Sequence, residues 1–115
     1  MSKTRVELVH QTLRNLGALP GSQVPPDDDF NLVNNLIEPV SAMLRERDVY
    51  FLVDPDVIPD EAFLPLAHVL AAYSASSFGQ QSDDRIMALG DIGERHLQTM
   101  QSEQPHYTTL QIQAY

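Results

Sequence analysis

Residues 27–47 read DDDFNLVNNLIEPVSAMLRER and carry the strongest helical pattern in the chain. Three aspartates open the stretch, where carboxylates are favoured at the positive end of a helix. Apolar side chains then recur at the spacing of one helix face: Phe30, Val33, Ile37, Val40 and Leu44, widened by Leu36 and Met43. The pattern predicts a long helix whose stripe is the main seam of the core. Pro39 lies inside it and predicts a kink, or a split near Leu36.

A shorter helix is predicted before this stretch, from about Thr4 to Leu16. Thr4 and Glu7 have the spacing of a capping box, in which two side chains satisfy free backbone N–H groups at a helix start. An apolar stripe follows at helical spacing, formed by Val6, Val9, Leu13 and Leu16. Gly17 suits the left-handed position that ends many helices, and the proline-rich residues 18–26 predict a loop.

A third helix is predicted from about Pro59 or Asp60 to Phe78. Proline suits the first turn of a helix, and Asp60 and Glu61 suit its positive end. One side is lined by Phe63, Leu66, Leu70 and Tyr73. Most other positions are alanine or serine, which permits close approach of a second helix. Gly79 then ends the helix.

A fourth helix is predicted from about Asp83 to Gln101, with Ser82 as its cap. Its stripe is formed by Ile86, Leu89, Gly93, Leu97 and Met100. Gly90 and Gly93 share a face, and each costs about 1 kcal/mol relative to alanine in an exposed helix. Close packing against the small face of the third helix would explain both glycines.

Two segments are predicted to be extended. Val49–Val53 is a run of five apolar residues, typical of a short buried strand or extended segment that needs a partner from elsewhere in the chain or from another chain. After Pro105, polar and apolar residues alternate, which predicts an extended arm. The expected fold is therefore all-α: a bundle of about four helices in residues 1–101, followed by a C-terminal arm in residues 102–115.

The charge of the chain limits its partners. Sixteen acids and seven bases give a net charge of −9, and no lysine or arginine lies between Asp48 and Asp84. This balance disfavours a free-standing nucleic-acid binder, because such proteins neutralise phosphates, and it disfavours an anionic membrane surface. The absence of cysteine excludes disulfides and thiolate metal sites.

No residue pattern indicates catalysis. The common hydrolase, metalloprotease and nucleotide-binding motifs are absent, so we predict no catalytic residue, no cofactor and no metal. His68 and the serine-rich residues 73–77 are interpreted as packing groups. Acids near residues 54–61 could form a carboxylate pair or a calcium site, but capping and a solvated surface explain them better. Arg45 and Arg47 are interpreted as cations at a helix C-terminus rather than as a phosphate site.

The order of helices and loops resembles the head-to-tail adaptors, or head-completion connectors, of tailed bacteriophages. The resemblance covers roughly residues 4–100 and is a pattern of helices and turns rather than a catalytic motif. It rests on Leu13-Arg14-Asn15-Leu16-Gly17, the Gly21-Ser22-Gln23 loop, Met43-Leu44-Arg45, Val49-Tyr50-Phe51, Ile58-Pro59-Asp60, Leu64-Pro65-Leu66-Ala67, Ala71-Ala72-Tyr73 and Phe78-Gly79.

The resemblance implies a structural virion protein at the junction of capsid vertex and tail, present in the host cytoplasm before assembly. Such subunits form a ring, usually of twelve copies, below the portal protein. The ring extends the DNA channel and offers a platform for the next tail or nozzle protein. Members often dock onto the portal through a C-terminal extension, a role that the arm matches in position through Tyr107, Leu110, Ile112 and Tyr115.

An acidic protein suits a DNA conduit, because a negative wall repels phosphates. The candidates for lining such a channel are Asp54, Asp56, Asp60, Glu61, Asp83 and Asp84. Two other classes stay open at this point: a cytoplasmic α-helical interaction module or small regulator, and a small hydrolase with a carboxylate pair. The first would show no affinity for a portal ring. The second would need two acids in different environments within one cleft.

Overall fold

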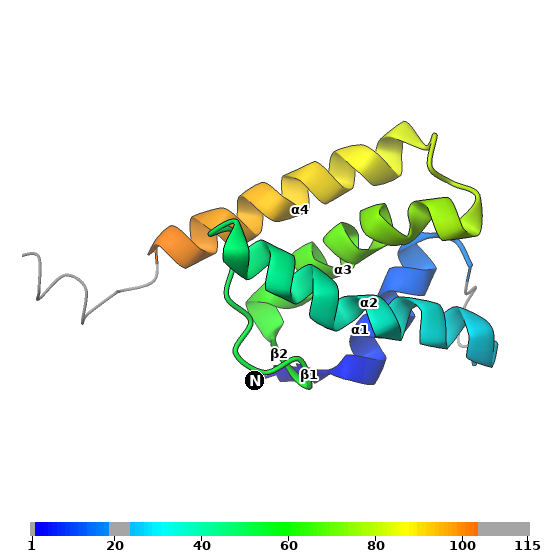
Figure 1. Ribbon diagram of the computed structural model, residues 1–115, viewed down its shortest axis with the longest axis horizontal. Coiled ribbons are helices and arrows are strands. Elements are labelled where there is room, and N and C mark those ends of the chain that lie inside the picture. Colours follow the sequence, from blue (N-terminus) through cyan, green and yellow to red (C-terminus); the bar gives the residue numbers. More distant parts are fainter. Residues whose placement is uncertain (1, 19–23, 104–115) are drawn as a thin grey trace, which may run out of the picture.

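The computed structural model describes residues 2–18 and 24–103 of the chain. Within them the fold is mostly helical, with four α-helices, one 3₁₀ turn and a two-stranded antiparallel sheet (Figure 1). The elements are β1 (Ser2–Thr4), α1 (Arg5–Asn15), α2 (Asp27–Glu46), β2 (Val57–Pro59), α3 (Asp60–Ser74), η1 (Ala75–Phe78) and α4 (Asp84–Glu103). The predicted all-α bundle of four helices is confirmed.

The predicted ends of α1 are confirmed. The Thr4 hydroxyl accepts a hydrogen bond from the Glu7 N–H at 3.1 Å, and the Glu7 carboxylate accepts one from the Thr4 N–H at 2.8 Å. Gly17 adopts the left-handed conformation with φ 74°. The predicted stripe is wrong at one position: Val6 is half exposed, whereas Leu8 is fully buried. The helix is thus turned slightly relative to the face predicted from spacing.

The predicted split of α2 is wrong. The helix runs from Asp27 to Glu46 without interruption and contains Pro39. Proline leaves the carbonyl four residues earlier without its helical partner, and here that carbonyl belongs to Asn35. Both Pro39 and Asn35 are exposed, so water can satisfy the carbonyl and the helix continues.

The end of α2 is a left-handed turn at Asp48, which has φ 58°. The Val49 N–H bonds to the Leu44 carbonyl at 2.8 Å, and the Asp48 N–H bonds to the Arg45 carbonyl at 3.1 Å. These two bonds form a Schellman motif, usually built around glycine. The motif directs the chain back to the core, where Val49 and Leu44 are both buried.

The centre of the core is α3, which packs against α1, α2 and α4. The predicted α2 stripe is buried against this helix. Four of its residues belong to the same buried cluster as the predicted partners on α1 and α3: Val33, Ile37, Val40 and Leu44 with Leu13, Leu66 and Leu70. Phe30, at the start of the seam, is only partly buried. The most extensive helix contact joins α3 to α4 (Figure 1).

The close packing predicted for Gly90 and Gly93 is confirmed. A Cβ atom at Gly90 would lie 2.6 Å from the Cβ of Ala72. A Cβ atom at Gly93 would lie 2.7 Å from the carbonyl oxygen of Pro65. Both distances are shorter than carbon or oxygen contacts allow, so the absent side chains permit α4 to lie against the backbone of α3.

Val49–Val53, predicted as a short buried strand or extended segment, forms no strand. The segment is irregular, and Val49, Tyr50 and Leu52 pack into the core of their own chain. The actual sheet pairs Ser2–Thr4 with Val57–Pro59, with Lys3 opposite Ile58. Each strand has only three residues, too short for alternation to be recognised in sequence.

The start and end of α4 differ slightly from the prediction. Asp83, rather than Ser82, caps the helix: its carboxylate accepts hydrogen bonds from the N–H groups of Arg85 at 2.9 Å and Ile86 at 3.2 Å. The helix continues to Glu103, past the predicted end at Gln101.

Four residues of the C-terminal arm were predicted to make docking contacts: Tyr107, Leu110, Ile112 and Tyr115. They lie outside the described residues.

Candidate functional site

The six candidate channel acids fall into two groups at opposite ends of α3. Asp54 and Asp56 lie in the loop before β2, and Asp60 and Glu61 lie in the first turn of α3. Asp83 and Asp84 lie at the start of α4, beyond the other end of α3 (Figure 1). A helix of 15 residues spans about 22 Å, so one subunit presents two separate acidic groups rather than one.

Three of these acids have structural roles. Asp83 caps α4, and the Asp54 carboxylate accepts a hydrogen bond from the Asp56 N–H at 2.9 Å, closing the turn. Asp56 lies 3.6 Å from the Arg5 guanidinium. The Asp54 carboxylate thus closes a turn, and Asp83 takes the capping position that was predicted for Ser82. Five of the six acids are exposed, and Asp83 is half-buried.

Arg5 joins three segments and was not singled out by any sequence pattern. Its Nε donates to the Asn34 side chain at 2.6 Å, and its guanidinium also donates to the Asn34 carbonyl at 3.1 Å. Glu38 and Asp56 each lie at 3.6 Å. The side chain is only 20% exposed, so its charge serves to hold α1, α2 and the loop before β2 together.

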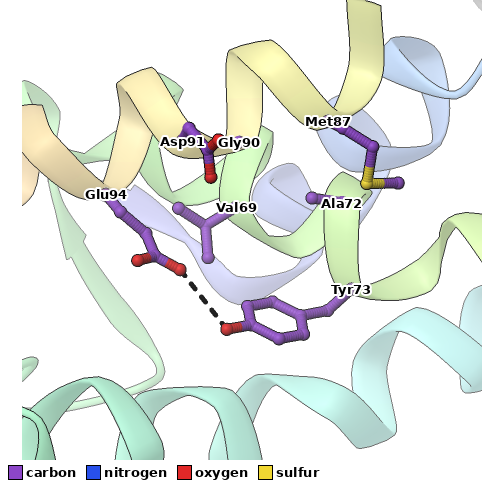
Figure 2. A pocket seen from close by; sticks show the side chains of 7 residues that line it. All are labelled: Val69, Ala72, Tyr73, Met87, Gly90, Asp91 and Glu94. Carbon is purple, nitrogen blue, oxygen red and sulfur yellow. Dashed lines mark hydrogen bonds between the residues drawn. The ribbon is translucent and has the colours of Figure 1, made fainter. Parts of the chain in front are cut away.

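A shallow pocket of about 350 Å³ lies between α3 and α4 (Figure 2). At its mouth the Tyr73 hydroxyl donates to the Glu94 carboxylate at 3.3 Å, and Arg47 pairs with the same carboxylate at 3.2 Å. Partial burial and the Glu94 charge raise the pKa of Tyr73. Tyr73 therefore stays protonated at neutral pH and acts as a hydrogen-bond donor rather than a nucleophile.

The two arginines at the end of α2 contact protein groups. The hydrogen bond to Glu94 raises the pKa of Arg47. The guanidinium of Arg45 lies over the ring of Phe51, 5.9 Å from its centre. The interpretation of Arg45 and Arg47 as cations at a helix end is thereby favoured over a phosphate site.

Ser74 lies within the serine-rich segment and is buried. Its hydroxyl donates to the Leu70 carbonyl at 2.7 Å, as expected of a packing group.

His68 lies between α1 and α4, with its Nδ1 3.5 Å from the Asn15 amide nitrogen. Partial burial, and then the nearby Arg85 charge, lower its pKa. The unfolded chain therefore binds a proton at His68 more readily than the folded chain does. The contribution of His68 to the free energy of unfolding should therefore be fully present above pH 6.5, the ordinary pKa of the group. It should be lost as the pH drops below that value.

Replacing His68 by glutamine should remove part of this acid sensitivity. The expected result is a smaller drop in melting temperature between neutral and mildly acidic pH than in the parent protein. His96→Gln, at an exposed position of α4, is the matched control and should leave the drop unchanged. Equal pH profiles for His68→Gln and the parent would contradict the assignment.

An open apolar groove lies where the end of α4 meets the segment after α2. Its volume is about 400 Å³, and it is lined by Tyr50, Phe51, Val53, Asp54, Val57, Pro59 and Gln101. The Gln101 side chain fixes this meeting point by accepting a hydrogen bond from the Phe51 N–H at 3.1 Å. We call it the terminal groove. The sequence did not reveal it, because residues 49–53 were predicted to be a short buried strand or extended segment.

The described residues contain no group of three or more histidines, aspartates or glutamates placed to hold a metal ion. None of the helices in that part of the chain is long and apolar enough to cross a membrane. Comparison of the chain with protein families, curated proteins and solved structures found no match.

Proposed function

We propose that the protein is a structural virion protein, a head-to-tail adaptor. In this proposal twelve copies form a ring below the portal protein, extend the DNA channel and present a platform to a downstream tail or nozzle protein. The C-terminal arm is a docking element whose contact residues are Tyr107, Leu110, Ile112 and Tyr115. Its partner is either the portal or a neighbouring copy.

The observation that carries the proposal is an open apolar groove beside a group of exposed acids at one end of the helical body. Phe51, Val53 and Val57 leave a large part of their apolar surface in water, which favours contact with another protein. Asp60 and Glu61 lie in the first turn of α3 at the same end. Such acids repel DNA phosphates and so keep passing DNA from adhering.

The direct test is assembly with a portal ring. Purified protein mixed with portal rings of the same virus should give a larger particle in which electron microscopy shows a second ring stacked on the portal. A helical interaction module or regulator would leave the mass of the portal ring unchanged, and that result would reject the adaptor proposal.

Reversing one charge at each end of α3 should identify the wall of the channel. Glu61 and Asp84 both lie in the first turn of a helix and are both exposed, so Glu61→Lys and Asp84→Lys carry a matched stability cost. Only the variant whose lysine faces the channel should retain DNA inside assembled connectors. That retention should weaken with added salt, because it depends on phosphate contacts.

The measurement is DNA release from connector-bearing particles at several salt concentrations. The variant at the other end of α3 serves as the control for a general effect of added positive charge. Release that is equal to the parent's in both variants would contradict an acidic lumen at these positions.

A further inference from the structure

The terminal groove is an open, mostly apolar surface of a protein that has a net negative charge. Three of its side chains leave large fractions exposed: Phe51 47%, Val53 81% and Val57 48%. The three side chains line one groove, so their exposed apolar surface lies together, which favours contact with another protein. The volume of about 400 Å³ falls at the lower end of the ~300–1,000 Å³ of pockets that enclose small groups.

The groove lies beside the point where the C-terminal segment begins. Gln101 forms one side of the groove, and α4 ends two residues later at Glu103. The remaining residues, 104–115, read QPHYTTLQIQAY. They include no aspartate, glutamate, lysine or arginine, and they carry the aliphatic side chains of Leu110 and Ile112.

We propose that residues 104–115 of one copy fill the terminal groove of a second copy, with Leu110 and Ile112 as the inserted side chains. This inference rests on the proposed function, because a ring holds a neighbouring copy at a fixed place beside each groove. It assigns the arm to a contact between subunits. The contact with the portal then falls to the helical body.

The charge distribution favours contact between two copies through the arm rather than through the helical bodies. Each copy has a net charge of −9, so two helical bodies repel each other. The uncharged arm can approach the groove, where Asp54 is the one charged lining residue, without that repulsion. Its apolar side chains would cover Val53 and Val57.

The length of the arm also allows contact with a neighbouring copy. The helix α4 ends at Glu103, two residues after Gln101 of its own groove. Leu110 and Ile112 lie seven and nine residues further on, a distance of about 23–30 Å for extended chain. This length allows the anchors to reach an adjacent subunit that a ring holds beside the first.

The contact is expected to depend on side chains rather than on strand pairing. In β2 the Val57 N–H already donates to the Asp54 carbonyl at 3.0 Å, and Pro59 has no N–H group. Ile58 is the remaining residue of the strand, and it pairs with Lys3 of β1. The strand therefore offers little backbone for an added strand, and the apolar groove beside it is the better receptor.

The test uses two complementary variants of the full chain. The arm variant, Leu110→Asp with Ile112→Asp, keeps an intact groove. The groove variant, Val53→Asp with Val57→Asp, keeps an intact arm, and both substitutions lie at exposed side chains. Circular dichroism melting curves confirm that each variant is folded. Masses are measured by light scattering over a wide range of concentration.

The parent should form species heavier than one chain as its concentration rises, and each variant alone should remain a single chain. An equimolar mixture of the two should give twice the mass of one chain, because one intact arm meets one intact groove. A synthetic peptide of residues 104–115 should bind the arm variant and not the groove variant.

Three results would overturn the proposal: a parent that stays monomeric, a groove variant that associates as the parent does, or a mixture that stays at the mass of one chain. None of these measurements involves the portal. If the parent joins portal rings but does not self-associate, the adaptor proposal stands and the arm–groove contact is rejected. If the parent self-associates but does not join portal rings, the contact stands and the adaptor proposal is rejected.

Discussion

Replacing Ile37 by aspartate should abolish the folded state of the protein. Ile37 is 2% exposed and lies in the main core cluster, on the face of α2 that packs toward α3. Loss of a buried isoleucine side chain costs about 2–5 kcal/mol through lost burial and the cavity left behind. The new carboxylate adds an unpaired buried charge. The sum is comparable with the ~5–15 kcal/mol total stability of a small domain.

The measurement is a circular dichroism spectrum with a thermal melt. Ile37→Asp should show little helix at room temperature and no cooperative transition. Val53→Asp is the matched control, because it places the same carboxylate on a β-branched residue that is 81% exposed. It should melt close to the parent. A cooperative melt for Ile37→Asp near that of the parent would mean that the core seam is misassigned.

Replacing Gly90 by alanine should destabilise the protein, although alanine is the better helix former. The new Cβ would lie 2.6 Å from the Cβ of Ala72, and overpacking of this kind costs about 1–3 kcal/mol. The gain in helix propensity is about 1 kcal/mol. With so short a contact we expect the net result to be a loss, and each kcal/mol lowers the melting temperature by about 4–8 °C in a domain of this size.

A double-mutant cycle with Ala72→Gly tests the cause directly. Removing the Cβ of Ala72 should relieve the contact, so the double variant should be more stable than the sum of the single changes predicts. Ala88→Gly, at an exposed position of α4, measures the propensity term alone. Strict additivity of Gly90→Ala and Ala72→Gly would show that the two helices are not in contact at this point.

The helices were predictable because their signals are local. The Thr4–Glu7 capping box and the stripe through Ile37 depend on residues within a few positions of each other, and the structure confirms them. Of the kink or split predicted from Pro39, the split near Leu36 is wrong, because sequence does not show whether the freed carbonyl faces water. The small sheet was not predicted, because Ser2–Thr4 pairs with residues more than fifty positions away.

The candidate surface was only partly predictable. Sequence reasoning found the acids, but the length of α3 separates Glu61 from Asp84. The terminal groove was missed because Phe51 and Val53 belong to an apolar run, and only the folded chain shows that the run is irregular and that these two side chains point outward. The role of the arm in residues 105–115 stays a prediction.

The small sheet has a consequence for the order of folding. Its two strands are about 55 residues apart in sequence, so pairing them requires closure of a long loop, which slows a folding step relative to local contacts. By contrast, α3, η1 and α4 follow one another with only residues 79–83 between η1 and α4. We therefore expect the α3–α4 hairpin to be the earliest structure in a refolding reaction. The amide protons of β1 should gain protection from hydrogen exchange last.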